Sequence, residues 1–247
     1  MGHVPRELVA ELQRDLQLIR AIETGTYRGH SAKLLAGLFD SVVTIELSEE
    51  LHRRYSPGLI ADHGITALQG DSRTLLRGLV EPDVPTLYFL DGHWSGGVTA
   101  GEDAECPVLE ELDAIAAGNE ADCILIDDAR LFAAPPPPPH DREQWPTLVE
   151  VFDALRRARP EHHVTMLVDL VIAVPPQARR TVDTFGQTHP MVEPGPLAGL
   201  AGQLGGLYRR QFAASEASLP APAPSTWADR LEAWMTRRSY AARRPAC

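Results

Sequence analysis

The sequence predicts an α/β protein: a mostly parallel sheet with helices on both faces, followed by a C-terminal helical extension. Two observations predict this class. Short apolar runs alternate with helical patterns between residues 21 and 176, and such an alternation is typical of parallel strands joined by crossover helices. Of the 247 residues, 44% are hydrophobic and 23% are charged, which is the composition of an ordinary globular protein.

Each expected element follows from a local pattern. Apolar residues recur at steps of three and four over 4–20, so this segment is expected to form an amphipathic helix. Runs of apolar and β-branched residues indicate strands at 21–25, 41–47, 64–71, 86–91 and 122–128, with one long or two short strands over 162–176. Helical patterns lie between them at 30–39, 48–60, 72–80, 106–118 and 145–160.

The predicted domain organisation has four parts. They are an N-terminal helix (1–20), one ligand-binding domain (21–190), a linker rich in Gly, Pro and Ala (191–226) and a basic helix (227–247). The basic helix is expected to dock on the acidic body of the chain, with a second copy in a homo-oligomer or an anionic surface as the alternatives.

Five consecutive prolines at 135–139 follow the last acidic strand end. They predict an extended polyproline loop, which is either a rim of the ligand site or a stiff surface loop.

Charge and cysteine content limit the classes of partner and the cellular location that we expect. The chain has 34 acidic and 23 basic residues and a formal net charge of −11, so nucleic acid is not an expected partner. No apolar run reaches the ~18–20 residues needed to cross a bilayer, and the N-terminus lacks a secretory pattern. Three scattered cysteines predict neither a disulfide framework nor a Cys-rich zinc site. A cytoplasmic location is therefore expected.

A glycine-containing turn, ETGTYRG at 23–29, follows the first expected strand. Its glycines permit a tight turn and the close approach of a ligand. Glu46 ends the second strand about 20 residues after Gly25, where Rossmann-like folds place an acid against ribose hydroxyls. Asp71 and Ser72 end the third strand and are placed to meet an adenine edge. The middle glycine of Gly-x-Gly-x-x-Gly is absent, which favours a nucleoside without a phosphate chain over a nicotinamide dinucleotide.

Three carboxylates close two further strands. Asp91 ends the run at 86–91, and Asp127 and Asp128 end the run at 122–128. If these strands are parallel neighbours ~4.8 Å apart, the three acids meet at one edge of the sheet. Clustered carboxylates repel one another, and a divalent cation such as Mg²⁺, Ca²⁺ or Mn²⁺ relieves that repulsion. The acids therefore predict a metal site, unless they only cap local turns.

These motifs resemble the class I S-adenosylmethionine-dependent methyltransferases, in particular the catechol-type, metal-dependent O-methyltransferases and their sugar and macrolide relatives. The resemblance covers about residues 20–175 and implies a Rossmann-like sheet, S-adenosylmethionine as cofactor, and Mg²⁺ held by the three strand-end acids. The acceptor it implies is a small-molecule hydroxyl of natural-product or sugar type. It is carried by ETGTYRGHSA, VVTIELSEEL, LQGDSRTLL, LYFLDGHW and ILIDDA. The cofactor residues that we predict are Glu23, Gly25, Thr26, Tyr27, Gly29, Ser31, Glu46, Leu47, Asp71, Ser72, Asp91, His93 and Trp94.

Asp91 and His93 are the expected catalytic residues. A histidine with a pKa near the working pH suits removal of a hydroxyl proton. The resembled family uses a lysine shortly after its His-Trp pair, whereas this chain has Ser-Gly-Gly at 95–97 and an extra residue, Gly92, before His93. His93 is thus either the base or, with Trp94, a neighbour of the adenine.

The acidic loop that follows contains Asp103 and Glu105. We expect it to be solvated, with contact of Asp103 and Glu105 with the metal or a cationic substrate as the alternative.

Two other functions are compatible with the same sheet. One is a nicotinamide-dependent oxidoreductase, against which the missing glycine argues. The other is a catalytically silent nucleoside-binding or assembly protein, which the missing lysine keeps open. The sequence does not identify the methyl acceptor or distinguish O- from N-methylation.

Overall fold

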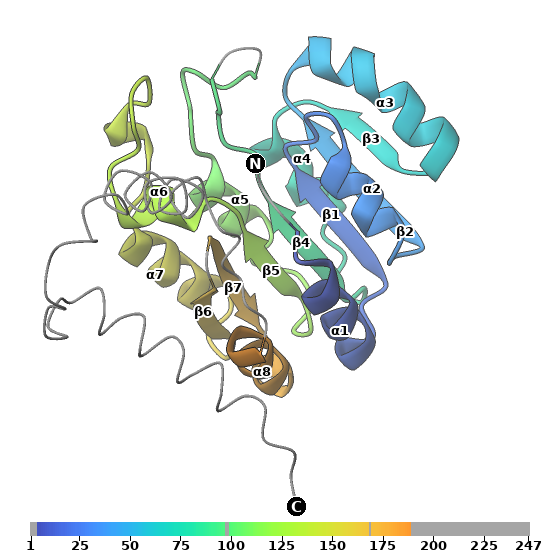
Figure 1. Cartoon of the computed structure of the whole chain (residues 1–247), viewed down its shortest axis with the longest axis vertical. Helices are drawn as coiled ribbons and strands as arrows, with labels where there is room; N and C mark the ends of the chain where they lie inside the picture. The colour runs from blue at the N-terminus through green and yellow to red at the C-terminus, as the bar shows by residue number, and fades with distance from the viewer. Residues whose placement is uncertain (1–3, 97–98, 168, 189–247) are drawn as a thin grey trace, which may run out of the picture. The chain divides into compact units, whose positions relative to one another are not determined.

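The computed structural model has the predicted α/β architecture (Figure 1). It describes residues 4–96, 99–167 and 169–188, which belong to the first of two units, Met1–Met191. The predicted linker at 191–226 and basic helix at 227–247 lie outside the described residues.

The described strands form one sheet in the order β3-β2-β1-β4-β5-β7-β6. All neighbours pair in parallel except at β7, which is antiparallel to both β5 and β6. The mostly parallel sheet is therefore confirmed, and the segment 162–176 forms two strands because the chain reverses between Leu167 and Leu170. The strands are β1 Arg20–Thr24, β2 Ser41–Glu46, β3 Thr66–Gln69, β4 Thr86–Leu90, β5 Cys123–Ile126, β6 His163–Leu167 and β7 Leu170–Val174.

The helices begin where local signals predict them. The Ser48 hydroxyl accepts a hydrogen bond from the Leu51 N–H, and Thr147 and Glu150 form a reciprocal capping box. Two short helices, α6 and α8, were not predicted. No described helix is both long and apolar enough to cross a membrane. The helices are α1 Arg6–Leu16, α2 His30–Ala36, α3 Glu49–His63, α4 Ser72–Leu79, α5 Val108–Ala114, α6 Ala129–Ala133, α7 Leu148–Ala158 and α8 Arg179–Thr188.

Each face of the sheet has its own hydrophobic core. Alternate strand residues point to opposite faces, so Ala21 packs with α1, α2, α3 and α8 whereas Ile22 packs with α4, α5 and α7. Leu8 and Leu12 of α1 are fully buried in the first core. The N-terminal helix therefore covers the same sheet that carries the predicted ligand site.

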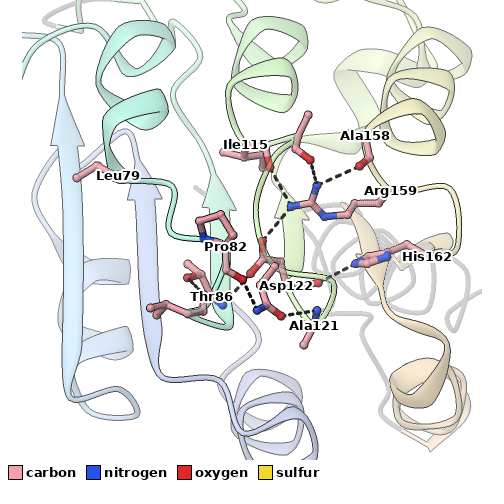
Figure 2. Close-up of polar contacts among 12 residues, drawn as sticks. Leu79, Pro82, Thr86, Ile115, Ala121, Asp122, Ala158, Arg159 and His162 are labelled. Atoms are coloured by element: carbon pink, nitrogen blue, oxygen red, sulfur yellow. Dashed lines mark hydrogen bonds and ion pairs between the residues drawn. The ribbon is translucent and has the colours of Figure 1, made fainter.

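Asp122 and Arg159 form a buried ion pair at the amino-terminal edge of the sheet (Figure 2). Arg159 Nη2 lies 2.9 Å from Asp122 Oδ2 and also donates to the Ile115 carbonyl. Asp122 Oδ1 accepts the Thr86 N–H at 2.9 Å, and the Asp122 carbonyl lies 2.8 Å from His162 Nε2. This network joins β4, β5 and the end of α7 at the amino-terminal ends of the strands, whereas the predicted site lies at their carboxyl ends.

The chain leaves β1 and β4 in opposite directions, because β2 lies on one side of this pair and β5 on the other. Such a switch point opens a crevice at the carboxyl ends of the strands. Gly25 follows β1 with φ +82°, and a Cβ there would lie 2.0 Å from the carbonyl oxygen of Asp91, which follows β4. Only glycine allows the two segments to approach this closely.

Candidate functional site

A cavity of about 200 Å³ lies at the carboxyl ends of β1, β2 and β3. Four of the predicted cofactor residues line it: Gly25, Leu47, Asp71 and Ser72. Its other wall is the loop at 101–104, which we expected from the sequence to be solvated rather than part of the site. The remaining lining residues are Ile45, Gly70, Arg73 and Pro107.

The turn after β1 is held by Glu46. Its Oε2 accepts the Tyr27 N–H at 2.8 Å and its Oε1 accepts the Ser48 N–H at 2.8 Å. Tyr27 has φ +46°, and a Cβ on Gly29 would lie 2.6 Å from Leu59 Cδ2. Glu46 therefore braces the turn. Each of its oxygens keeps a second acceptor position for a ribose hydroxyl.

Glu23 lies beneath this turn. It is fully buried, and Thr44 Oγ1 donates to its Oε2 at 2.6 Å while Thr44 also pairs with Thr26 at 2.7 Å. Burial raises the pKa of Glu23 to about 7, against the opposing effect of the Ser31 and Thr44 hydroxyls. Glu23, Thr26 and Ser31 thus form a polar support under the turn. A direct contact of Glu23 with the cofactor stays a prediction.

Asp71 is already engaged by a residue that the sequence did not single out. Arg73 Nη2 lies 2.6 Å from Asp71 Oδ2, and Arg73 Nε lies 3.0 Å from both carboxylate oxygens. The hydrogen bonds from Arg73 lower the pKa of Asp71. The cavity wall predicted for adenine therefore carries a guanidinium as well as a carboxylate.

The structure brings the three strand-end acids into one electrostatic cluster with His93. Burial, followed by the charges of Asp127 and Asp128, raises the pKa of Asp91 well above its ordinary value. Burial and the charge of Asp128 raise the pKa of Asp127 to about 6. Burial acts the same way on Asp128, but His93 and Arg130 outweigh it and lower its pKa to about 2.

Asp128 has a cationic or hydrogen-bonding partner at each oxygen. Its Oδ2 lies 2.6 Å from His93 Nε2, and its Oδ1 lies 2.5 Å from Arg130 Nη1, which also pairs with Asp169. His93 Nδ1 lies 3.5 Å from Asp91 Oδ1. Within the ranges that the structure describes, no group of three or more His, Cys, Asp or Glu is arranged to hold a metal ion.

An aromatic cluster adjoins His93. The ring centroids of His93 and Trp145 lie 5.4 Å apart, those of Trp94 and His140 also 5.4 Å, and those of His140 and Trp145 5.3 Å. Trp94 is buried beneath this cluster, 8% exposed. The sequence did not identify Trp145 or His140, which approach His93 and Trp94 only through the fold.

Trp145 also lines a second cavity, of about 160 Å³. Phe132, Arg142 and the first two prolines of the run at 135–139 line it together with Trp145. The chain turns at 138–139, so the prediction of an extended run over all five prolines is wrong. Pro135 and Pro136 line the second cavity, and the alternative that the run forms a rim of the ligand site stays a prediction.

The burial of two carboxyl groups was not predicted. Glu105 is 2% exposed, so the expectation of a solvated loop is wrong at this residue. Glu111 is 1% exposed, and burial raises its pKa to about 7 despite the neighbouring hydroxyls of Ser72 and Thr24. Glu111 lies on the same face of α5 as the buried residues Val108 and Leu112. Its position three residues after Val108 could have predicted its burial. No local pattern marks Glu105.

The fold is shared with solved structures of O-methyltransferases, although no protein-family model and no curated protein matches the chain. A proposed caffeoyl-CoA O-methyltransferase from Staphylococcus aureus has a TM-score of 0.53 at 16% identity, covering 71% of this chain and 84% of that one. A proposed O-methyltransferase from Klebsiella pneumoniae has a TM-score of 0.50 at 18% identity, covering 69% and 79%. The O-methyltransferase TomG from Streptomyces achromogenes, solved with S-adenosylmethionine, has a TM-score of 0.50 at 19% identity, covering 69% and 78%. The predicted Rossmann-like α/β fold is confirmed.

Proposed function

We propose that this chain is an S-adenosylmethionine-dependent methyltransferase that methylates a hydroxyl of a small molecule of natural-product or sugar type. One observation carries the proposal. The cavity at the ends of β1–β3 lies beside a histidine–carboxylate pair at the ends of β4 and β5, so a nucleoside cofactor and a proton acceptor fall at one switch point. The shared fold, and the cofactor bound to TomG, support this assignment.

The proposed acceptor site is the second cavity. Trp145 lines that cavity, and its ring centroid lies 5.4 Å from that of His93. An acceptor held there would have to extend past Trp145 to bring its hydroxyl to His93, while the cofactor's methyl group approaches from the cavity beside Gly25. The protein's contribution to the rate is then the alignment of oxygen, methyl carbon and sulfur for in-line transfer.

The proposed base is His93, oriented by Asp128. Because Nε2 lies 2.6 Å from the Asp128 carboxylate, a proton on Nε2 is stabilised there and Nδ1 keeps its lone pair. Methyl transfer forms the oxygen–carbon bond and breaks the carbon–sulfur bond, and the hydroxyl proton passes to Nδ1. Asp91, 3.5 Å from Nδ1, stabilises the resulting imidazolium.

A divalent cation, with Mg²⁺ the expected ion, is a further part of the proposal. Asp91 and Asp127 fit it, because like charge and burial raise both pKa values and because Asp127 Oδ2 is buried without a hydrogen-bond partner in the described chain. Asp128 would join them only after releasing His93 and Arg130. A bound cation would stabilise negative charge on the acceptor oxygen.

Calorimetric titration tests the cofactor assignment. We expect S-adenosylmethionine and S-adenosylhomocysteine to bind and NADH not to bind. The opposite selectivity would favour the oxidoreductase. Transfer of a labelled methyl group to a panel of hydroxylated acceptors, with and without a chelator, then tests catalysis and the metal. Cofactor binding without turnover on the whole panel would favour the silent binding protein.

His93→Gln separates the two predicted roles of that residue. If His93 is the base, turnover falls by about 10²- to 10⁴-fold while the affinity for S-adenosylhomocysteine is retained. If His93 is an adenine contact, the affinity falls instead.

A further inference from the structure

Glu105 is a buried carboxylate with three donors. Its Oε1 accepts the Asp141 N–H at 2.9 Å, and its Oε2 accepts the Trp145 indole N–H at 2.6 Å and lies 3.0 Å from His140 Nδ1. Burial alone would raise the pKa of Glu105, but these hydrogen bonds outweigh it and lower the pKa. The side chain is therefore an anion that is fully satisfied by one short segment of the chain, residues 140–145.

The backbone of Glu105 also connects the loop at 101–104 with the segment 140–145. Its N–H donates to Gln144 Oε1 at 3.0 Å, and Gln144 Nε2 lies 3.4 Å from the Glu102 carbonyl. The Glu105 carbonyl accepts the Trp94 N–H at 2.7 Å. Glu102 lines the first cavity and Trp145 lines the second, so Glu105 lies at the joint between the two cavity walls.

We propose that Glu105 is a positioning residue, whose carboxylate fixes the cofactor-cavity loop at 101–104 to the segment 140–145 and thereby sets Trp145 against His93. This inference rests on the proposed function, because it assigns the two cavities to cofactor and acceptor. Glu105 touches neither ligand in this arrangement. It acts through Trp145, His140 and Gln144.

The contact between the loop and the segment 140–145 requires a side chain at position 105 that accepts hydrogen bonds at both of its terminal atoms. A carboxylate offers lone pairs at both oxygens, whereas glutamine replaces one oxygen with an NH₂ that faces a donor. Glu105→Gln keeps the side-chain volume but places a donor against a donor. Glu105→Ala removes the side-chain volume and all of the carboxylate's hydrogen bonds. Gln144→Ala removes the backbone arm and leaves the carboxylate in place. Glu143→Gln is the matched control, because Glu143 is an exposed acid in the same segment.

The experiment measures S-adenosylhomocysteine affinity by calorimetry on the full chain, together with the indole N–H resonance of Trp145, assigned with Trp145→Phe. We expect Glu105→Gln to weaken binding about tenfold and to shift the Trp145 resonance. Gln144→Ala should weaken binding in the same direction, and Glu143→Gln should bind within about twofold of the wild type.

Wild-type affinity in Glu105→Gln would overturn the proposal, because a residue that only fills space tolerates glutamine. If both Glu105 variants fail to fold, Trp145→Phe decides, because it removes the indole donor to Oε2 and leaves Glu105 in place: unchanged affinity there also overturns the proposal. If the wild-type chain binds no S-adenosylhomocysteine, the proposed function fails, and the positioning role that rests on it fails with it. Wild-type binding that Glu105→Gln leaves unchanged refutes the positioning role alone.

Discussion

Gly25→Ala is the sharpest test of the switch-point geometry. A Cβ at this position would lie 2.0 Å from the carbonyl oxygen and 2.7 Å from the carbonyl carbon of Asp91. Both are backbone atoms, and the Asp91 N–H is held by the Thr24 carbonyl at 3.2 Å. The clash therefore cannot be relieved by rotating a side chain, so β1 and β4 must separate.

The expected cost has two parts. Placing a non-glycine residue at φ +82° costs about 1–2 kcal/mol, and forcing an extra methyl group into packed surroundings adds about 1–3 kcal/mol. Gly64→Ala provides a matched control, because Gly64 has φ +65° and a Cβ added there would meet no atom within 4 Å. The two variants should therefore differ in their free energy of unfolding by about 1–3 kcal/mol.

Urea unfolding of wild type, Gly25→Ala and Gly64→Ala measures this difference directly. Thermal unfolding should show a Tm for Gly25→Ala that is roughly 2–12 °C below that of Gly64→Ala. Because Gly25 lines the first cavity, its variant should also bind S-adenosylhomocysteine more weakly. Equal unfolding midpoints for the two variants would refute the close approach of β1 to Asp91.

Three further predictions concern charged groups. Asp128→Asn should reduce methyl transfer about 100-fold or more with the cofactor affinity within about twofold, since it removes the group that orients His93; equal turnover would exclude that role. The pKa of Glu111 is raised from 4.5 to about 7, so the native state binds this proton more tightly than the unfolded state, and stability falls as pH rises through that interval. Glu111→Gln should flatten this fall, as urea unfolding at pH 5 and 7 would show. Asp122→Ala leaves the Arg159 charge buried without its partner, so the free energy of unfolding should fall by about 3–5 kcal/mol in the same assay. The affinity for S-adenosylhomocysteine should stay at the wild-type value, because the proposed cofactor cavity lies at the opposite ends of the strands.

The strands were predictable because their signals are local. A buried parallel strand is a nearly continuous apolar run, and each of β2, β4 and β5 is such a run closed by a polar residue. The acids at these strand ends were predicted to meet, and the charges of Asp127 and Asp128 add to burial in raising the pKa of Asp91. Parallel pairing alone carries them to the same edge.

The partners of those acids were not predictable in the same way. Arg73 is two residues from Asp71, but nothing in a helical pattern says that its guanidinium turns back onto the helix cap. Arg130 lies on a five-residue helix whose position depends on the turn at Asp128, φ +56°. Such contacts depend on rotamers and turn conformations that a pattern of residue types does not encode.

The sequence by itself determined the order of strands and helices, the glycine turn after the first strand and the acids at the strand ends, because each depends on residues that are close along the chain. Only the tertiary structure decided which loops close over the sheet. Glu105 is buried by Asp141, His140 and Trp145, which lie 35 to 40 positions away. No periodicity or spacing in the sequence predicts these contacts, because they arise from the packing of two loops whose paths depend on the folded sheet beneath them.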